Sequence, residues 1–161
     1  MVFILTFIPH HIRRLWQFGQ TLLGLVFRHP LTGVSVIPIL PNGQIVLVRR
    51  RDSGLWALPG GMVEWGEDVP STAQRELLEE SGLELVKIRR LVGVYSAPDR
   101  DSRFHSISIL VEADVRGNMN VKDTLEISDV QAFEPNSVPE GLSHDYDRQL
   151  KDYFSGATIL A

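Results

Sequence analysis

The sequence predicts an α+β fold, and three observations carry the prediction. Segments rich in Val, Ile and Leu have the composition and alternation of β-strands. Four of these segments are long enough to build a sheet, residues 33–40, 44–50, 85–95 and 104–114, and a last short strand is expected at 130–133. Two other stretches, 72–80 and 144–154, have helical composition or spacing. Strands and helices do not alternate regularly, so an α+β arrangement is favoured over a doubly wound parallel sheet.

Length and composition indicate one domain with a buried core. The chain has 161 residues, of which 43% are hydrophobic. A net charge of −4 gives no overall field that would favour nucleic acid, so no nucleic-acid partner is expected. The sequence has no cysteine, which excludes disulfides and thiolate metal sites and fits a cytoplasmic location.

Residues 1–30 are expected to form an N-terminal helical extension ahead of a domain at 31–161. An apolar stripe with helical spacing predicts an amphipathic helix, and it contains Ile12, Leu15, Trp16, Gly19, Leu22, Leu23, Val26 and Phe27. We expect this helix to pack on its own domain or on a homodimer partner. The alternative is a helix lying on a membrane surface, because Arg13 and Arg14 flank the stripe. Residues 1–9 are apolar but too short to span a bilayer, and they lack a signal-peptide pattern.

The first two strands are expected to form a hairpin. Pro41, Asn42 and Gly43 separate them, and Asn-Gly is typical of a type I′ turn. Pro38 indicates a sheet edge or a bulge at that point. Three arginines end the second strand. Such runs are usually solvated, but this one lies shortly before a glycine-rich turn, so Arg50 is a candidate for a phosphate contact.

The glycine-rich turn follows a short strand within 54–58 and leads into a predicted helix. Residues 72–80 contain good helix formers and no Gly or Pro, and Gly82 suits a left-handed C-cap. Either Asp68 or Ser71 can cap the start of the helix.

The charges of this helix are unusual for a purely structural element. Glu76, Glu79 and Glu80 are spaced i, i+3 and i+4, so they share a helix face and repel each other. With Glu67 just before the helix, they could bind a hard divalent cation such as Mg²⁺ or Mn²⁺. The alternative is an acidic face exposed to solvent.

The spacing of these residues resembles the signature of the Nudix hydrolases, a family with MutT-like members. The signature is G-x5-E-x7-R-E-U-x-E-E-x-G-U, in which U is aliphatic. All nine fixed positions are present here: Gly61, Glu67, Arg75, Glu76, Leu77, Glu79, Glu80, Gly82 and Leu83. The resemblance is sharpest over residues 33–83, looser to about residue 135, and does not include residues 1–30.

The resemblance implies an α/β/α sandwich with a mixed sheet and a small-molecule nucleotide substrate. It implies hydrolysis of a diphosphate that joins a nucleoside to a second moiety. The implied metal ligands are Glu76, Glu79, Glu80 and the backbone carbonyl of Gly60, with Mg²⁺ or Mn²⁺ as cofactor. Arg75 would orient one of the carboxylates, and Glu67 would support the loop. The general base varies in the family between a glutamate of the signature and one from a later loop.

In this sequence the late candidates for the base are Glu126 and Glu134, and Glu126 is included with Glu76, Glu79 and Arg75 among the catalytic candidates.

The loop after the strand at 85–95 bears on the substrate. It resembles the R-D-P-R-x-H segment of Nudix enzymes that act on ADP-ribose and related compounds, except that Ser102 replaces the usual Pro. Arg100 and Arg103 could bind phosphate, and Phe104 could stack on a base or belong to the core. The alternative is a solvated loop whose Asp and Arg side chains pair with each other.

ADP-ribose or a related compound is therefore the favoured substrate. The alternatives are a nucleoside-triphosphate pyrophosphohydrolase and a non-catalytic module that binds a nucleotide sugar. Because such modules usually have eroded glutamates and this signature is intact, an enzyme is favoured.

Overall fold

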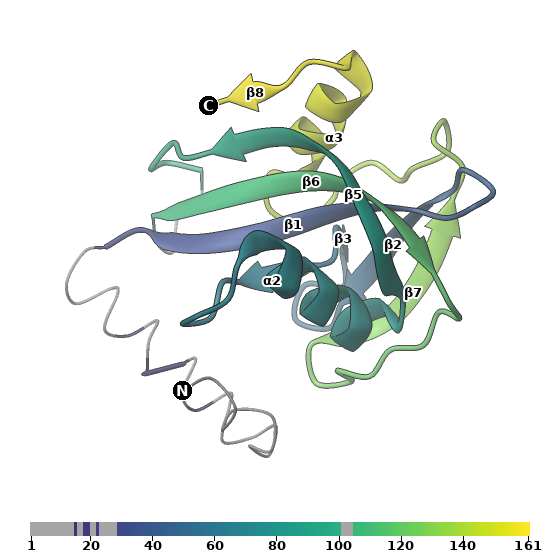
Figure 1. The fold of residues 1–161 in the computed structure, drawn as a ribbon, viewed down its shortest axis with the longest axis horizontal. Helices are drawn as coiled ribbons and strands as arrows, with labels where there is room; N and C mark the ends of the chain where they lie inside the picture. The colour runs from purple at the N-terminus through teal and green to yellow at the C-terminus, as the bar shows by residue number, and fades with distance from the viewer. Residues whose placement is uncertain (1–14, 16–17, 20–21, 23–28, 101–104) are drawn as a thin grey trace.

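The computed structural model describes residues 15, 18–19, 22, 29–100 and 105–161. The described residues contain an eight-stranded sheet, whose main order is β3-β2-β1-β6-β5-β8, with β4 paired to β1 and β7 paired to β2 (Figure 1). The strands are β1 (Leu31–Ile39), β2 (Ile45–Arg50), β3 (Trp56–Ala57), β4 (Gly60–Met62), β5 (Glu84–Tyr95), β6 (Ser106–Arg116), β7 (Ile127–Phe133) and β8 (Ile159–Leu160). The sheet is mixed, because β1–β6 and β5–β8 are parallel and the other pairs are antiparallel.

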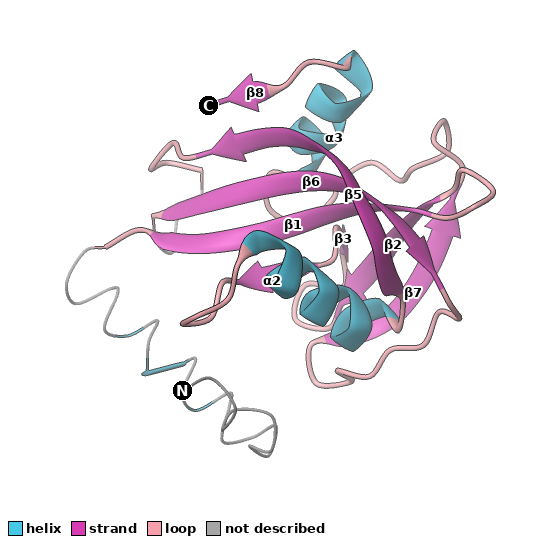
Figure 2. Ribbon diagram, viewed as in Figure 1, coloured by secondary structure: helices cyan, strands magenta, loops and turns pink. Residues whose placement is uncertain are grey.

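Helices cover the sheet from both sides, as Figure 2 shows for α2 (Val69–Glu76) and α3 (Tyr146–Ser155). Two cores result. One buries Ala73 and Leu77 against the sheet, and the other buries Leu142 and Leu150 against its opposite face. The predicted α/β/α sandwich with a mixed sheet is confirmed.

Pro38 requires a correction, because β1 is a central strand and not an edge. Its full length pairs in parallel with β6, including Pro38 opposite Ala113. On the other side of β1 the neighbour changes, from β4 at residues 33–35 to β2 at Ile39. At Pro38, β1 therefore pairs with β6 on one side and has no paired strand on the other. The N–H group that proline lacks removes no hydrogen bond between strands at this position.

The hairpin between β1 and β2 also differs from the prediction. A type I′ turn needs positive φ at both central residues, but Gly43 has φ 88° while Asn42 is not among the positive-φ residues. The Gly43 N–H donates to the Leu40 carbonyl at 2.8 Å, and the Leu40 N–H donates to Gln44 at 3.0 Å. The loop is thus a tight turn with a left-handed glycine in its last position, a geometry that suits Pro41 at its start.

Capping residues mark both ends of the helix that contains the signature. Of the two caps left open, Asp68 is the one used, since its carboxylate accepts the Ser71 N–H at 2.8 Å. Gly82 ends the helix with φ 75°, as predicted. Between them, the α-helical turns give way to one π-helical turn over Leu77–Ser81, which continues α2. Such turns often occur at functional sites, and composition alone did not predict this one.

Two strands were missed by the sequence analysis. β4 has only three residues, and β8 lies in the stretch 155–161, for which no structure was predicted. β4 forms because the glycine-rich turn runs antiparallel to β1, which brings Gly60 and Gly61 beside the helix that follows. This strand is therefore the element that positions the glycines of the signature.

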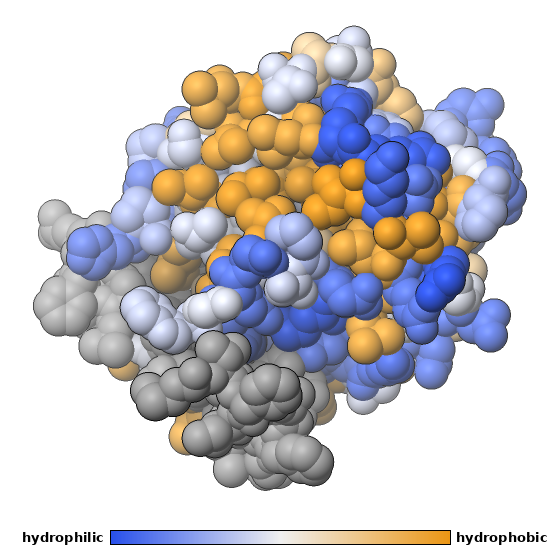
Figure 3. All heavy atoms as spheres, in the orientation of Figure 1, coloured by the Kyte–Doolittle hydropathy of each residue, from blue (hydrophilic) through white to orange (hydrophobic). Residues whose placement is uncertain are grey.

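The predicted helix at 12–27 lies mostly outside the described residues. Leu15, Phe18 and Leu22 are described, and all three are exposed. Figure 3 shows a further apolar surface over β5 and β6 beside α2, where Val86 and Leu91 are exposed. Among the described residues, no helix is long and apolar enough to cross a membrane.

Candidate metal and catalytic site

Glu80 is the most deeply buried carboxylate of the signature. It lies in the π-helical turn, is 5% exposed, and accepts the Gly60 N–H through Oε2 at 2.9 Å. Burial, reinforced by the charges of Glu76 and Glu126, raises the pKa of Glu80 well above its usual range. The Gly60 hydrogen bond and the charge of Arg50 lower the pKa only in part. The site therefore brings the negative groups of Glu76, Glu80 and Glu126 together.

The backbone of β4 approaches this cluster as closely as glycine allows. A Cβ atom at residue 61 would fall on the Glu76 carboxyl group, and one at residue 60 would lie 2.8 Å from the Ser35 Cα. Glu76 itself is buried, at 8% exposed. The absence of a Cβ atom at these two positions therefore lets the β4 backbone lie close to Ser35 and to the Glu76 carboxyl group.

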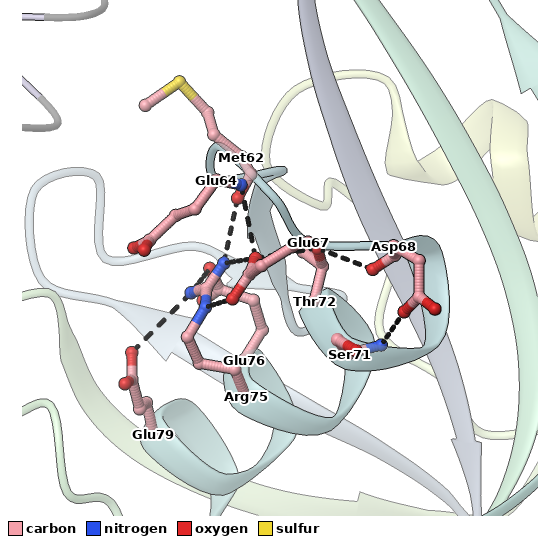
Figure 4. A network of polar contacts seen from close by, with 9 residues as sticks. All are labelled: Met62, Glu64, Glu67, Asp68, Ser71, Thr72, Arg75, Glu76 and Glu79. Carbon is pink, nitrogen blue, oxygen red and sulfur yellow. Dashed lines mark hydrogen bonds and ion pairs between the residues drawn. The ribbon is translucent and has the colours of Figure 1, made fainter. Parts of the chain in front are cut away.

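Arg75 joins the carboxylates of Glu67, Glu76 and Glu79 in one network, as Figure 4 shows. Its guanidinium bonds both oxygens of Glu67, at 2.8 and 2.9 Å, and the Met62 carbonyl at 2.9 Å. It also donates to Glu76 Oε1, and Glu79 lies 3.8 Å away. Burial of Glu67 opposes its ionisation, but the bonds from Arg75 and Thr72 outweigh burial and lower its pKa. This network ties the loop at 62–67 to α2 and fixes one oxygen of Glu76.

A divalent cation at this site would be held by oxygen atoms from several of these residues. Within the described ranges, no group of three or more carboxylate or imidazole side chains stands ready to enclose a metal ion. The donors nevertheless suit Mg²⁺ or Mn²⁺, since they are carboxylate and backbone oxygens with no thiolate. Together with the close approach of the Gly60 and Gly61 backbone, this donor set fits the metal that the signature implies.

Glu126 and Glu134 lie at opposite ends of β7, roughly 25 Å apart at strand spacing. Glu134 binds Gln44 at 3.0 Å on the exposed surface, whereas the charge of Glu126 acts on Glu80. The loop before Glu126 is fastened to the end of the signature helix, because the N–H groups of Lys122 and Asp123 donate to the Glu79 carbonyl at 3.0 and 2.8 Å. The fold thus brings Glu126 to the cluster and keeps Glu134 away from it.

The candidate substrate residues divide into three groups. Arg50 bonds Asp52 through two contacts of 3.0 and 2.7 Å, which lower the pKa of Asp52 to about 2, and its charge also reaches Glu80. Arg100 is buried and bonds Asp145. Arg103 and Phe104 lie outside the described residues.

A cavity adjoins the cluster on the α3 side of the sheet. It is lined by Gly60, Gly61 and Met62 of β4, by residues of β1 and β6, and by Arg100, Asp145 and Gln149. Sequence analysis missed Asp145, Tyr146 and Gln149, which belong to α3 or cap it. Nothing in their local pattern indicates a site; they reach it because β1 and β6 pair in parallel and α3 packs across both strands.

Comparison with known proteins identifies a family. The family model described as NUDIX domain matches residues 29–154. An ADP-ribose pyrophosphatase of Methanocaldococcus jannaschii is 40% identical over 131 residues, which are 80% of this chain and 75% of that protein. A candidate 8-oxo-dGTP diphosphatase of Bacillus subtilis is 33% identical over 78% of this chain and 80% of its own length.

A solved MutT NUDIX hydrolase from Burkholderia pseudomallei superposes with a TM-score of 0.67 at 27% identity, covering 77% of this chain and 98% of that one. The signature, the fold that positions it and these matches lead to one conclusion: the chain belongs to the Nudix hydrolase family.

Proposed function

We propose that this protein hydrolyses the diphosphate bond of ADP-ribose or a closely related nucleoside diphosphate compound, with Mg²⁺ or Mn²⁺ as cofactor. The observation that carries the proposal is the buried Glu80 carboxylate, held against the Gly60 backbone beside Glu76 and Glu126. The relative from Methanocaldococcus jannaschii supports ADP-ribose as the substrate.

Each residue of the site has a role that follows from its contacts. Glu76, Glu79, Glu80 and the Gly60 backbone would hold the cation, which neutralises diphosphate oxygens and lowers the pKa of a bound water. Arg75 fixes Glu76 through Oε1. Glu126 is the proposed general base, because it approaches Glu80 from a separate loop and can take a proton from the attacking water.

The substrate is tested by a panel of ADP-ribose, a nucleoside diphosphate sugar and a nucleoside triphosphate, each with Mg²⁺, Mn²⁺ or EDTA. We expect ADP-ribose to give AMP and ribose 5-phosphate with the highest kcat/KM, and no turnover in EDTA. The relative from Bacillus subtilis makes nucleoside-triphosphate pyrophosphohydrolysis the second candidate. Preference for the triphosphate, with release of pyrophosphate, would replace the first proposal by the second.

The narrow space beside Gly61 gives a prediction about Gly61→Ala. The added methyl displaces the Glu76 carboxyl group, and a misplacement of about 1 Å in a catalytic group can cost about 100-fold in rate. The melting temperature should change little, because the displaced group is the end of a flexible side chain. Steady-state kinetics and thermal melts measure both effects. An unchanged kcat would show that catalysis does not depend on the position of the Glu76 carboxyl group.

We also propose that residues 1–30 are separable from the catalytic domain. The family model begins at residue 29, and β1 begins at Leu31. Deletion of residues 1–28 should therefore leave kcat within about twofold of the full chain, while solubility or oligomeric state changes. A loss of kcat at unchanged folding, measured by circular dichroism and kinetics, would place part of the site in the extension.

A further inference from the structure

The turn that carries Glu126 lies between two buried residues. Asp123 is 9% exposed and Ile127 is 1% exposed, whereas the three residues between them are exposed. The Ile127 N–H donates to the Asp123 carbonyl at 3.0 Å and closes the turn. A segment with few buried contacts gains little from packing, so the direction in which this turn presents Glu126 depends on its hydrogen bonds.

The Asp123 carboxylate supplies two of these bonds. Its Oδ1 accepts the Leu125 N–H at 3.1 Å and the Glu126 N–H at 3.4 Å. An aspartate that accepts backbone N–H groups two and three residues ahead holds the chain in a turn, as aspartates do in Asx-turns and at helix starts. The backbone of Glu126 itself is therefore held by a buried residue.

Two neighbouring elements fasten the same turn. On the side of the signature helix, the Asp123 N–H donates to the Glu79 carbonyl at 2.8 Å. On the side of β2, the Arg51 N–H donates to the Glu126 carbonyl at 2.7 Å, and Arg51 Nε donates to the Thr124 carbonyl at 3.0 Å. The third arginine of the run after β2 therefore bonds this turn.

These contacts place the turn relative to the carboxylate cluster. Asp123 bonds the backbone of Glu79, a proposed metal ligand, and it also holds the N–H of Glu126. Asp123 is thus a short link between the helix that would hold the metal and the proposed base. A general base must lie about 2.6–3.2 Å from the atom whose proton it takes, so a small displacement of the turn would separate Glu126 from its water.

We propose that Asp123 is a positioning residue, whose carboxylate holds the backbone of Glu126 so that the Glu126 side chain reaches the attacking water. The proposal rests on the proposed function for the role of Glu126. Glu126 takes one proton of the water while the water oxygen bonds to phosphorus and the bond from that phosphorus to the leaving phosphate breaks. Asp123 acts through Glu126 by its hydrogen bonds and not by its charge, so a neutral acceptor at the same position is sufficient.

The test is a double-mutant cycle of Asp123→Ala and Glu126→Gln, with kcat measured at saturating Mg²⁺. Glu126→Gln alone should lower kcat by about 100- to 10,000-fold, the range for loss of a general base. Asp123→Ala alone should lower kcat by about 10- to 100-fold, since a shift of about 1 Å can cost about 100-fold. In the Glu126→Gln background, Asp123→Ala should cost less than about twofold, because the two residues act as one unit.

Two results of the cycle would overturn the proposal. Losses that add in the double variant would show that Asp123 does not act through Glu126. Full kcat in Glu126→Gln would remove the proposed base and the role of Asp123 together. If Asp123→Ala does not fold, Arg51→Met takes its place in the cycle, because Arg51 is exposed and bonds the same turn.

A conservative variant and a control separate positioning from folding. Asp123→Asn keeps the Oδ1 acceptor and should retain kcat within about threefold of the wild type. Equal losses in Asp123→Asn and Asp123→Ala would contradict a role through hydrogen bonds. Asp129→Ala is the matched control, since Asp129 Oδ1 accepts the Val130 N–H at 2.8 Å at an exposed position of β7. This control should have the kcat of the wild type, and a loss as large as that of Asp123→Ala would count against the proposal.

Amide hydrogen exchange tests the same bonds without metal or turnover. The N–H groups of Leu125 and Glu126 should exchange at least about tenfold faster in Asp123→Ala than in the wild type or in Asp123→Asn. Unchanged exchange would overturn the proposal even if ADP-ribose is hydrolysed. If a nucleoside triphosphate is the preferred substrate instead, the proposed substrate falls, and the cycle measured on the triphosphate decides the role of Asp123.

Discussion

Replacing Glu80 by glutamine should lower kcat by about 1,000-fold or more. The change keeps the shape of the side chain and an acceptor for the Gly60 N–H, but it removes the charge of a proposed metal ligand. A single well-placed group that stabilises charge in the transition state contributes about 100- to 1,000-fold to the rate. Loss of a metal ligand also weakens the binding of the cation that supplies this stabilisation. Steady-state kinetics over a wide range of Mg²⁺ concentrations measures the effect. Full activity of Glu80→Gln at any Mg²⁺ concentration would exclude Glu80 as a ligand.

The same variant has a second readout that needs no activity. Glu80 is a buried carboxylate whose ionised form is opposed by burial and by Glu76 and Glu126, so its charge destabilises the metal-free fold. In EDTA, Glu80→Gln should therefore melt at the same temperature as the wild type or higher. Adding Mg²⁺ should raise the melting temperature of the wild type alone, since ligand binding stabilises the folded state. A variant that melts lower than the wild type in EDTA would indicate that Glu80 has a structural role.

Arg75→Met should be the most destabilising single change near the site. It leaves Glu67 and Glu76, at 19% and 11% side-chain exposure, without the guanidinium that neutralises them. Removing one partner of a buried ion pair lowers the free energy of unfolding by about 3–5 kcal/mol. The lower end of this range applies here because Glu67 keeps some contact with water. For a chain of this size, about 3 kcal/mol corresponds to a fall in melting temperature of about 6–12 °C.

An exposed ion pair provides the control for this prediction. Arg116 bonds Glu84 at 3.1 Å, with 70% and 55% of the two side chains exposed. Arg116→Met removes the same kind of charge from the surface and should cost less than about 1 kcal/mol. Urea unfolding of both variants compares the free energies directly. Equal costs for the two variants would mean that the Arg75 network does not hold the loop to the helix.

The sequence was most informative where local chemistry decides the structure. Asp68 and Gly82 predicted the ends of the signature helix because capping depends on a few neighbouring residues. The Nudix resemblance implied that Arg75 orients one of the carboxylates, and in the fold Arg75 donates to Glu76. The π-helical turn was not predictable in this way; the contacts seen at it come from the loop that follows β6, where Asn120, Lys122 and Asp123 donate N–H groups to the Ser81 and Glu79 carbonyls.

The parts that the sequence did not predict depend on pairing between distant segments. The parallel contact of β1 with β6 and the attachment of β4 to β1 join residues far apart in the chain, and neither has a local signal. The same is true of Gln149, which looks like an ordinary polar residue in a helix and becomes part of a cavity only through tertiary packing. Arg100 was predicted as a site residue, but its partner Asp145, which determines its chemistry, lies 45 positions away.

The measurement that tests the central claim most directly is Mn²⁺ binding, followed by the loss of the free-ion electron paramagnetic resonance signal. The wild-type chain should bind Mn²⁺ saturably, and Mg²⁺ should displace it. Glu80→Gln should weaken binding by at least about tenfold, as expected when a ligand charge is lost. Glu84→Gln, which changes an exposed carboxylate paired with Arg116, should bind Mn²⁺ like the wild type. Equal Mn²⁺ affinity in the wild type and Glu80→Gln would contradict the assignment of this cluster as the metal site.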